Sequence, residues 1–283
     1  MSTPQVANKL ESSTCPNMAA GVASERPSHR AFVAVSVLLF AVCAALTIVS
    51  CASMSAMHGM QMPGGWTMSM AWMRMPGQTW PEAAVAFTGM WVVMMTAMML
   101  PALAPMLWRY REAIGETRSV RLGRLTMLVA LGYFFVWTLL GLAVFPVGIA
   151  VAAMEMKQPE LSRAVPLATG LVVLIAGAFQ FTKWKTHHLT CCRQAAGPRS
   201  KKADTGTAWR HGLNFGVHCT LCCANWTAVL LVLGVMDLQA MAALTVGITV
   251  ERLAPPGESV ARAGGFVLVS SGLVLIARAT GVM

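Results

Sequence analysis

Long apolar runs alternate along the chain with short polar segments that carry most of its charge. A membrane-spanning helix needs about 20 mostly apolar residues. Seven runs approach or reach that length, and they cover residues 31–53, 83–108, 125–152, 165–184, 213–234, 238–251 and 263–280. The sixth is short and lies between Asp237 and Glu251, so we expect a tilted or partly buried helix there. The pattern predicts an all-α, polytopic membrane helix bundle of about seven spans.

The runs divide the chain into three parts. Residues 1–30 are polar with mixed charge and predict a disordered cytoplasmic tail. Residues 31–82 predict the first transmembrane helix and an external, Met-rich loop, and residues 83–283 predict the remaining membrane bundle. Residues 31–51 could instead be a cleaved signal sequence, because Ile48–Cys51 resembles a lipoprotein cleavage box. The long segment before them favours an uncleaved helix.

Composition and charge support this organisation. The chain is 56% hydrophobic and only 11% charged, whereas a soluble domain carries about 25% charged residues. Seventeen of the 21 Lys and Arg residues fall in segments 1–30, 109–124, 183–212 and 252–262, which seven spans place on one side of the lipid bilayer. Because cytoplasmic loops collect Lys and Arg, we expect a cytoplasmic N-terminus and an external C-terminus in a bacterial inner (plasma) membrane. The net charge of +10 therefore indicates topology and not nucleic-acid binding.

Methionine is concentrated in one part of the chain, since 14 of the 22 lie between Met54 and Met106. Eight of these fall in the predicted external loop. Soft thioethers select Cu(I) over harder ions, so the loop is a candidate copper-collecting segment. Its candidate ligands are Met57, His58, Met60 and Met62. The alternative is that methionine is an adaptable apolar filler, and that the tryptophans of the loop anchor it at the membrane interface.

A second group of methionines lies in the run 83–108. Spacings of three and four residues place them on one broad face of a helix. The candidate ligands there are Met94, Met95, Met98 and Met99. Such a face could pass a soft cation inward, and Pro101 and Pro105 would free backbone carbonyls near its inner end. The alternative is helix packing by flexible side chains.

Five of the eight cysteines gather between residues 191 and 223, beside histidines. One segment continues the fourth span as a helix, with i, i+4 pairs of His187 with Cys191 and of His188 with Cys192. The other opens the fifth span and places its thiols on one helix face. Thiolate and imidazole together suit Cu(I) or Zn(II). The candidate ligands are His187, His188, Cys191, Cys192, His218, Cys219, Cys222 and Cys223.

Other interpretations of this group stay open. Vicinal cysteines also suit thiol–disulfide exchange, and buried free cysteine is a common small apolar residue. The basic residues between 193 and 212 could contact anionic lipid headgroups. Glu251 is an ionisable residue at a membrane boundary. It could complete a metal site, accept a proton or pair with Arg252.

Together these segments resemble a bacterial family of predicted metal-binding integral membrane proteins, a domain of unknown function. The resemblance covers roughly residues 83–275 and rests on Trp91–Pro101 with Pro105, Gln180–Arg193, Gly216–Cys223 and Gly234–Glu251. It implies metal binding. His188 stands where the family has a cysteine, which preserves ligation but weakens a disulfide mechanism. Ala224 stands where the family favours tryptophan, and the nearest aromatic residue is Trp226.

The sequence therefore predicts an inner-membrane protein that binds a soft transition metal, with Cu(I) favoured and Zn(II) as the second option. Its role would be uptake, or delivery to a metallochaperone or membrane metalloenzyme. The chain has no Gly-x-x-x-x-Gly-Lys phosphate-binding loop, so ATP-driven export is not indicated. A binding protein is favoured over an enzyme. The alternatives are a thiol oxidoreductase using Cys222 and Cys223 with Cys191 and Cys192, and a structural subunit of a metalloenzyme assembly.

Overall fold

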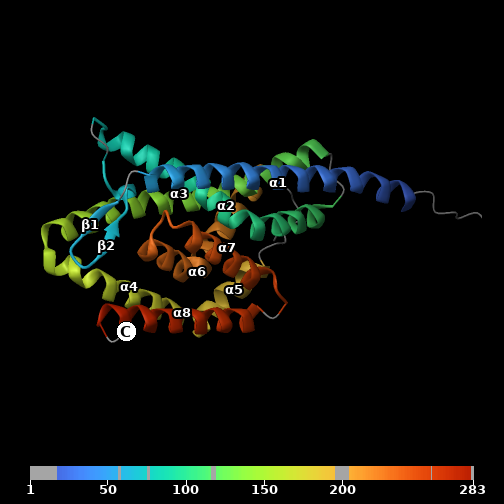
Figure 1. Cartoon of the computed structure of the whole chain (residues 1–283). Coiled ribbons are helices and arrows are strands. Elements are labelled where there is room, and N and C mark those ends of the chain that lie inside the picture. Colours follow the sequence, from blue (N-terminus) through green and yellow to red (C-terminus); the bar gives the residue numbers. More distant parts are fainter. Residues whose placement is uncertain are drawn as a thin grey trace, which may run out of the picture. The chain divides into compact units, whose positions relative to one another are not determined.

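A computed structural model describes residues 18–56, 59–74, 77–115, 119–194, 204–255 and 257–281 (Figure 1). The chain divides into two units, Met1–Leu38 and Leu39–Met283, and the helix packing and the sites described below belong to the second. The helices are α1 (Met18–Ala56), α2 (Trp80–Ile114), α3 (Ser119–Lys157), α4 (Pro159–Phe179), α5 (Lys183–Gln194), α6 (Thr205–Leu233), α7 (Leu238–Leu253) and α8 (Gly257–Ala279). The short elements are strands β1 (Met60–Met62) and β2 (Trp66–Met68) and the 3-10 helix η1 (Met70–Trp72).

Six helices in the described ranges are long and apolar enough to cross a membrane, namely α1, α2, α3, α4, α6 and α8. This confirms the predicted all-α, polytopic bundle and is compatible with a multi-pass membrane protein. The predicted sixth span, 238–251, forms helix α7. Its 16 residues rise only about 24 Å, less than the roughly 30 Å of a bilayer core. Asp237 caps this helix by accepting the N–H groups of Gln239 and Ala240 at 2.8 and 3.0 Å.

The fourth predicted span and the motif after it do not form one continuous helix. Helix α4 ends at Phe179 and α5 begins at Lys183. The backbone N–H groups between them bond to carbonyls three residues back, at 3.1 to 3.2 Å, which tightens the turn. The hydroxyl of Thr182 then accepts the N–H of Lys185 at 3.3 Å, as an N-cap does. This break redirects α5, and Lys185 becomes buried.

Glycines let pairs of helices approach closely. A Cβ on Gly212 of α6 would collide with the carbonyl oxygen of Val129 in α3, and one on Gly132 would lie 2.8 Å from the carbonyl oxygen of Trp209. Small residues permit such contacts between membrane helices. Helices α4 and α8, which lie side by side in Figure 1, pack in the same way. Their contact glycines are Gly170, Gly177 and Gly272, and Gly265 of α8 packs on Gln180 and Phe181 just after α4.

The predicted external loop contains an antiparallel hairpin, in which Met60 lies opposite Met68 and Met62 opposite Trp66. Met62 and Met68 are buried against Ala152 of α3. The indole N–H of Trp66 donates to the carbonyl of Ser162 at 2.9 Å. These contacts fix the hairpin to the ends of α3 and α4, because apolar burial and an indole hydrogen bond act together.

The N-terminal boundary also differs from the prediction. Helix α1 begins at Met18, so residues 18–30 of the predicted tail belong to a helix. Alanines at positions 19, 20 and 23 favour helix there, since alanine has the highest helix propensity. Residues 1–17 lie outside the described residues.

Candidate metal centre

Four cysteine thiols from two helices meet inside the bundle. Cys219, Cys222 and Cys223 come from α6 and Cys192 comes from α5, and each is at most 1% exposed. The sulfur atoms of Cys219 and Cys223 lie 3.9 Å apart. The thiol of Cys192 interacts with those of Cys219 and Cys222. We call these four side chains the thiol group.

The thiol group lies deeper in the bundle than the sequence pattern suggested. Helix α6 begins at Thr205, eight residues before the predicted start of the fifth span. Cys219 is fourteen residues along this helix, which corresponds to about 21 Å of helix rise. The thiols therefore lie well beyond the first turns of α6, and their burial shows that neighbouring helices enclose them.

Two polar groups from other helices contact the sulfur of Cys219. The hydroxyl of Tyr133 in α3 lies 3.0 Å away, and Nη1 of Arg252 in α7 donates to it at 3.2 Å. The guanidinium of Arg252 also lies over the ring of Phe215, with 5.5 Å to the ring centroid. Its Nε and Nη2 atoms are buried and have no hydrogen-bond partner among the described residues. A buried cation costs several kcal/mol unless an anion compensates it, so Arg252 favours negative charge on the thiol group.

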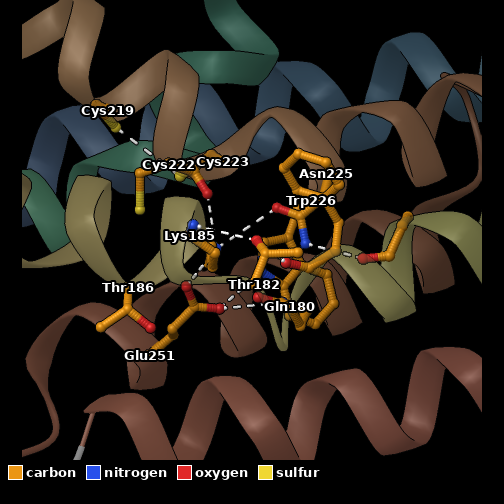
Figure 2. Close-up of polar contacts among 12 residues, drawn as sticks. Gln180, Thr182, Lys185, Thr186, Cys219, Cys222, Cys223, Asn225, Trp226 and Glu251 are labelled. Atoms are coloured by element: carbon orange, nitrogen blue, oxygen red, sulfur yellow. Dashed lines mark hydrogen bonds and ion pairs between the residues drawn. The ribbon is translucent and has the colours of Figure 1, made fainter.

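A buried ion pair lies beside the thiol group. The ammonium of Lys185 pairs with Oε1 of Glu251 and donates to the backbone carbonyl of Cys222 at 2.6 Å. Figure 2 shows this ammonium between the Cys222 backbone and the Glu251 carboxylate. Oε2 of Glu251 accepts the indole N–H of Trp226 at 2.9 Å and the amide of Gln180 at 3.2 Å. The ion pair therefore ties α5 and α7 to α6.

The structure changes the role expected of Glu251. Both carboxylate oxygens are already hydrogen-bonded, and the partner is Lys185, not the adjacent Arg252. Burial by itself lowers the pKa of the Lys185 ammonium, but the neighbouring Cys222 thiol and Glu251 carboxylate outweigh burial and hold that pKa above its ordinary value. Lys185 is thus charged at neutral pH and neutralises Glu251. Arg252 is left as the uncompensated positive charge beside the thiols.

The remaining predicted donors form a second, more exposed group, which we call the imidazole group. It consists of His187, His188 and Cys191 on α5 and His218 on α6. The ring centroids are 5.4 Å apart for His187 and His188 and 6.0 Å apart for His188 and His218. The sulfur of Cys191 lies 3.7 Å from Nε2 of His187, as expected for an i, i+4 pair. The other expected pair, His188 with Cys192, does not come together. Cys192 contacts the α6 thiols, whereas His188 packs on the ring of Trp184.

The histidines of this group are suited to ligation. Nδ1 of His188 and Nδ1 of His218 are buried without a partner among the described residues. Burial, together with the nearby His187 and His218, lowers the pKa of the His188 imidazole. The ring is therefore neutral at pH 7, which is the form that binds metals.

The thiol group is not a ready-made cage for a metal with many ligands. In the ranges that the structure describes, no three His, Cys, Asp or Glu side chains are arranged so that they could hold an ion. A two-coordinate ion needs only two of these ligands. Two sulfur atoms 3.9 Å apart can both lie about 2.3 Å from one ion, the usual metal–thiolate distance for zinc. The donor set therefore fits an ion that accepts two thiolates.

The methionine stripe is buried. Met94, Met95, Met98 and Met99 are each at most 4% exposed, and α2 packs against α3 and α7. The two prolines lie inside α2, which continues to Ile114. Helix packing alone also explains this burial, so the stripe as a copper path stays a prediction.

The structure describes two of the four predicted external ligands, Met60 and Met62. Met60 is 42% exposed, whereas Met62 is 8% exposed and packs in the hairpin cluster. Met57 and His58 lie outside the described residues. The two described side chains therefore differ in exposure, and copper collection by the four ligands stays a prediction.

Sequence reasoning missed Tyr133 and Lys185, and it did not pair Arg252 with Cys219. Both cations lie in segments counted as cytoplasmic loops, where Lys and Arg are expected. The local sequence gives no clear signal for either, because Lys185 lies between Trp184 and Thr186 and Arg252 lies between Glu251 and Leu253. It does not reveal their partners.

Comparison with known proteins then identifies the family. The copper chaperone family PpoB2 matches residues 88–275. The chain belongs to this copper chaperone family. The match extends from α2 to α8, so it includes the methionine stripe, the thiol group and the imidazole group. No curated protein matches the chain, and no solved structure does. The expectation of a metal-related family is thus confirmed, and the metal of the matched family is copper; the match does not describe the family as one of predicted metal-binding integral membrane proteins.

Proposed function

We propose that the protein binds Cu(I) at the thiol group in the bacterial inner membrane and delivers it to a partner metalloprotein. The observation that carries this proposal is the burial of four thiols beside the uncompensated guanidinium of Arg252. Soft thiolates select Cu(I). Membership of a copper chaperone family supports copper as the cargo.

Charge balance favours Cu(I) over Zn(II). Two thiolates around Cu(I) give a complex with one negative charge, which Arg252 neutralises. Four thiolates around Zn(II) give two negative charges, of which one would remain buried without a partner. The Lys185–Glu251 pair cannot compensate it, because that pair is already neutral as a unit. Cu(I) with two thiolates therefore leaves no net charge in the bundle, whereas Zn(II) with all four thiolates leaves one negative charge.

The imidazole group provides a route for delivery. His188 lies near both His218 and Cys222, and His187 with Cys191 is more exposed. Cu(I) would leave by ligand exchange, in which an incoming imidazole or thiolate binds as a cysteine of the thiol group departs. The oxidation state does not change in this step. A metallochaperone or a membrane metalloenzyme would accept the ion from the exposed members of the imidazole group.

Metal analysis of the detergent-purified protein, after growth with copper and zinc, tests the proposal. We expect about one thiol-bound copper ion per chain, which a variant with Cys219, Cys222 and Cys223 replaced by Ser should lose. The matched control replaces Cys43 and Cys51, which are buried elsewhere in the chain. Unchanged copper in the triple variant would overturn the proposal.

Thiol–disulfide chemistry is the second candidate, because Cys192 on α5 contacts Cys219 and Cys222 on α6. It requires a reducible disulfide between the two helices. Mild oxidation followed by peptide mass spectrometry measures this directly. A Cys192 disulfide to the α6 thiols, in a protein that retains no copper, would establish the oxidoreductase in place of the copper site.

A further inference from the structure

A cavity of about 380 Å³ lies between the end of α1, η1, the first part of α2 and α3. Its walls come from α1, from the segment after η1, from the first turns of α2 and from α3. Three methionines from three of these segments line it, namely Met54, Met73 and Met90. The thiol group lies elsewhere, and none of these three residues was a predicted ligand.

Aromatic contacts and a close approach to the α3 backbone fix the position of the cavity wall. The ring of Trp72 lies 5.3 Å from that of Phe87, and Phe87 lies 5.1 Å from Phe145. A Cβ on Gly148 would collide with the indole of Trp72, so this indole rests directly on the backbone of α3. Because Met73 follows Trp72, its backbone position is fixed relative to α2 and α3. Three methionines that are spread over 36 residues of sequence therefore line one cavity.

The chemistry of the lining selects a soft, singly charged ion. Among the described lining residues there is no carboxylate, and the one formal charge belongs to Arg74. Its guanidinium lies over the ring of Trp80, 5.2 Å from the centroid, and Arg74 is exposed, so water screens its repulsion. That repulsion is twice as large for a divalent ion as for Cu(I). Hard divalent ions prefer oxygen ligands, whereas thioethers favour Cu(I).

The cavity also connects to the methionine stripe. Met90 lies one helical turn before Met94, and Met94 is only 2% exposed. An ion held at Met90 is therefore next to the first buried thioether of α2. We propose that Met54, Met73 and Met90 form a second Cu(I) site, on the predicted external side, which loads the stripe; this inference rests on the proposed function. The ion enters by ligand exchange, as Cu(I), when the thioethers replace the ligands of its carrier.

Copper-edge X-ray absorption on selenomethionine-labelled protein tests this site, with Cu(I) itself as the probe. We expect a copper–selenium signal and a second copper equivalent in competition with a chromophoric Cu(I) chelator. Replacing Met54, Met73 and Met90 by Leu should remove both, and Leu conserves side-chain volume, so the fold is retained. The control replaces three other exposed methionines, Met127, Met154 and Met156 of α3, and should keep both.

This experiment tests the thiol site and the methionine site independently. Loss of the inner copper in the Cys→Ser variant, with the copper–selenium signal retained, is the expected result. A copper–selenium signal that is absent from the wild type, or that survives Met54, Met73 and Met90→Leu, overturns the external site and leaves the thiol site standing. Copper–selenium signal without any cysteine-dependent copper overturns the proposed function instead.

Discussion

Arg252 is the residue that decides the charge of the thiol group. Lys185 and Glu251 neutralise each other, whereas Arg252 donates to the sulfur of Cys219 and has two further nitrogen atoms without partners among the described residues. In a membrane interior a single buried charge is costly. The proposed anionic copper–thiolate complex would remove that cost, so copper binding would offset the burial of Arg252.

Replacing Arg252 by Met should weaken Cu(I) binding about 10- to 100-fold, as is typical when an outer partner of a metal ligand is lost. Arg252→Lys should lose less, because it keeps the charge but not the fork of N–H groups. Competition with a Cu(I) chelator gives both affinities. An Arg252→Met protein with wild-type affinity would show that the guanidinium has no part in holding copper.

The Lys185–Glu251 pair should behave as a unit. Lys185→Met leaves a buried carboxylate and Glu251→Gln leaves a buried ammonium, so each single change should cost about 3–5 kcal/mol of stability. The double variant leaves no charge and should recover most of the loss. Thermal unfolding in detergent, followed by tryptophan fluorescence, measures all three. Two single variants as stable as the wild type would mean that water reaches the pair.

At the scale of elements, the contact between α3 and α6 sets the geometry of the site. Gly212 and Gly132 bring the two backbones together, and the same contact places Tyr133 3.0 Å from the sulfur of Cys219. The break between α4 and α5 has a similar effect on the other side, since it turns Lys185 and Cys192 toward α6. The geometry of the site therefore depends on the contact between α3 and α6 and on the position where α4 ends.

Gly212→Ala should force α3 and α6 apart, because its Cβ would collide with a backbone carbonyl that cannot rotate away. Overpacking of this kind costs about 1–3 kcal/mol, which a lower midpoint of thermal unfolding would report. Gly123→Ala on α3 is the matched control, since nothing lies within 4 Å of its Cβ. That change should be neutral or should stabilise by roughly 0.5–1 kcal/mol. Equal melting of the two variants would contradict the close packing.

For the whole molecule, the distribution of positive charge predicts the orientation in the membrane. Two of the seventeen cations assigned to the cytoplasmic side, Lys185 and Arg252, are buried in the bundle. Helix α7 is shorter than a bilayer core, but Arg193 at the end of α5 donates to the carbonyl of Ala254, which follows α7. The segments that begin at residues 183 and 252 therefore meet at the same end of the bundle. Fifteen cations remain on that side, against four on the other. The asymmetry is still large, so the positive-inside rule continues to favour a cytoplasmic N-terminus.

Reporter fusions test this orientation. Alkaline phosphatase folds only outside the cytoplasm, so a fusion after residue 283 should be active, and one inserted between residues 195 and 203 should be inactive. Green fluorescent protein at the same two positions should give the opposite pattern. Active phosphatase at 195–203 would place the segment between α5 and α6 outside and would invert the proposed direction of copper movement.

The sequence pattern by itself determined where most helices lie and which side chains share one face of a helix. Apolar runs of sufficient length marked the helices, and i, i+3 and i+4 spacing put Cys219, Cys222 and Cys223 on one helix, because side-chain direction follows from local backbone geometry. The same rule accounts for the 3.7 Å contact of His187 with Cys191.

Only the tertiary structure decided which helices share the site. Glu251 pairs with Lys185 and not with its neighbour Arg252, and Met54, Met73 and Met90 line one cavity although the chain separates them widely. The break after Phe179 and the glycine contacts of α3 with α6 set these partners. Neither follows from periodicity, because a partner 30 to 120 residues away depends on how closely backbones pack and on where a helix turns.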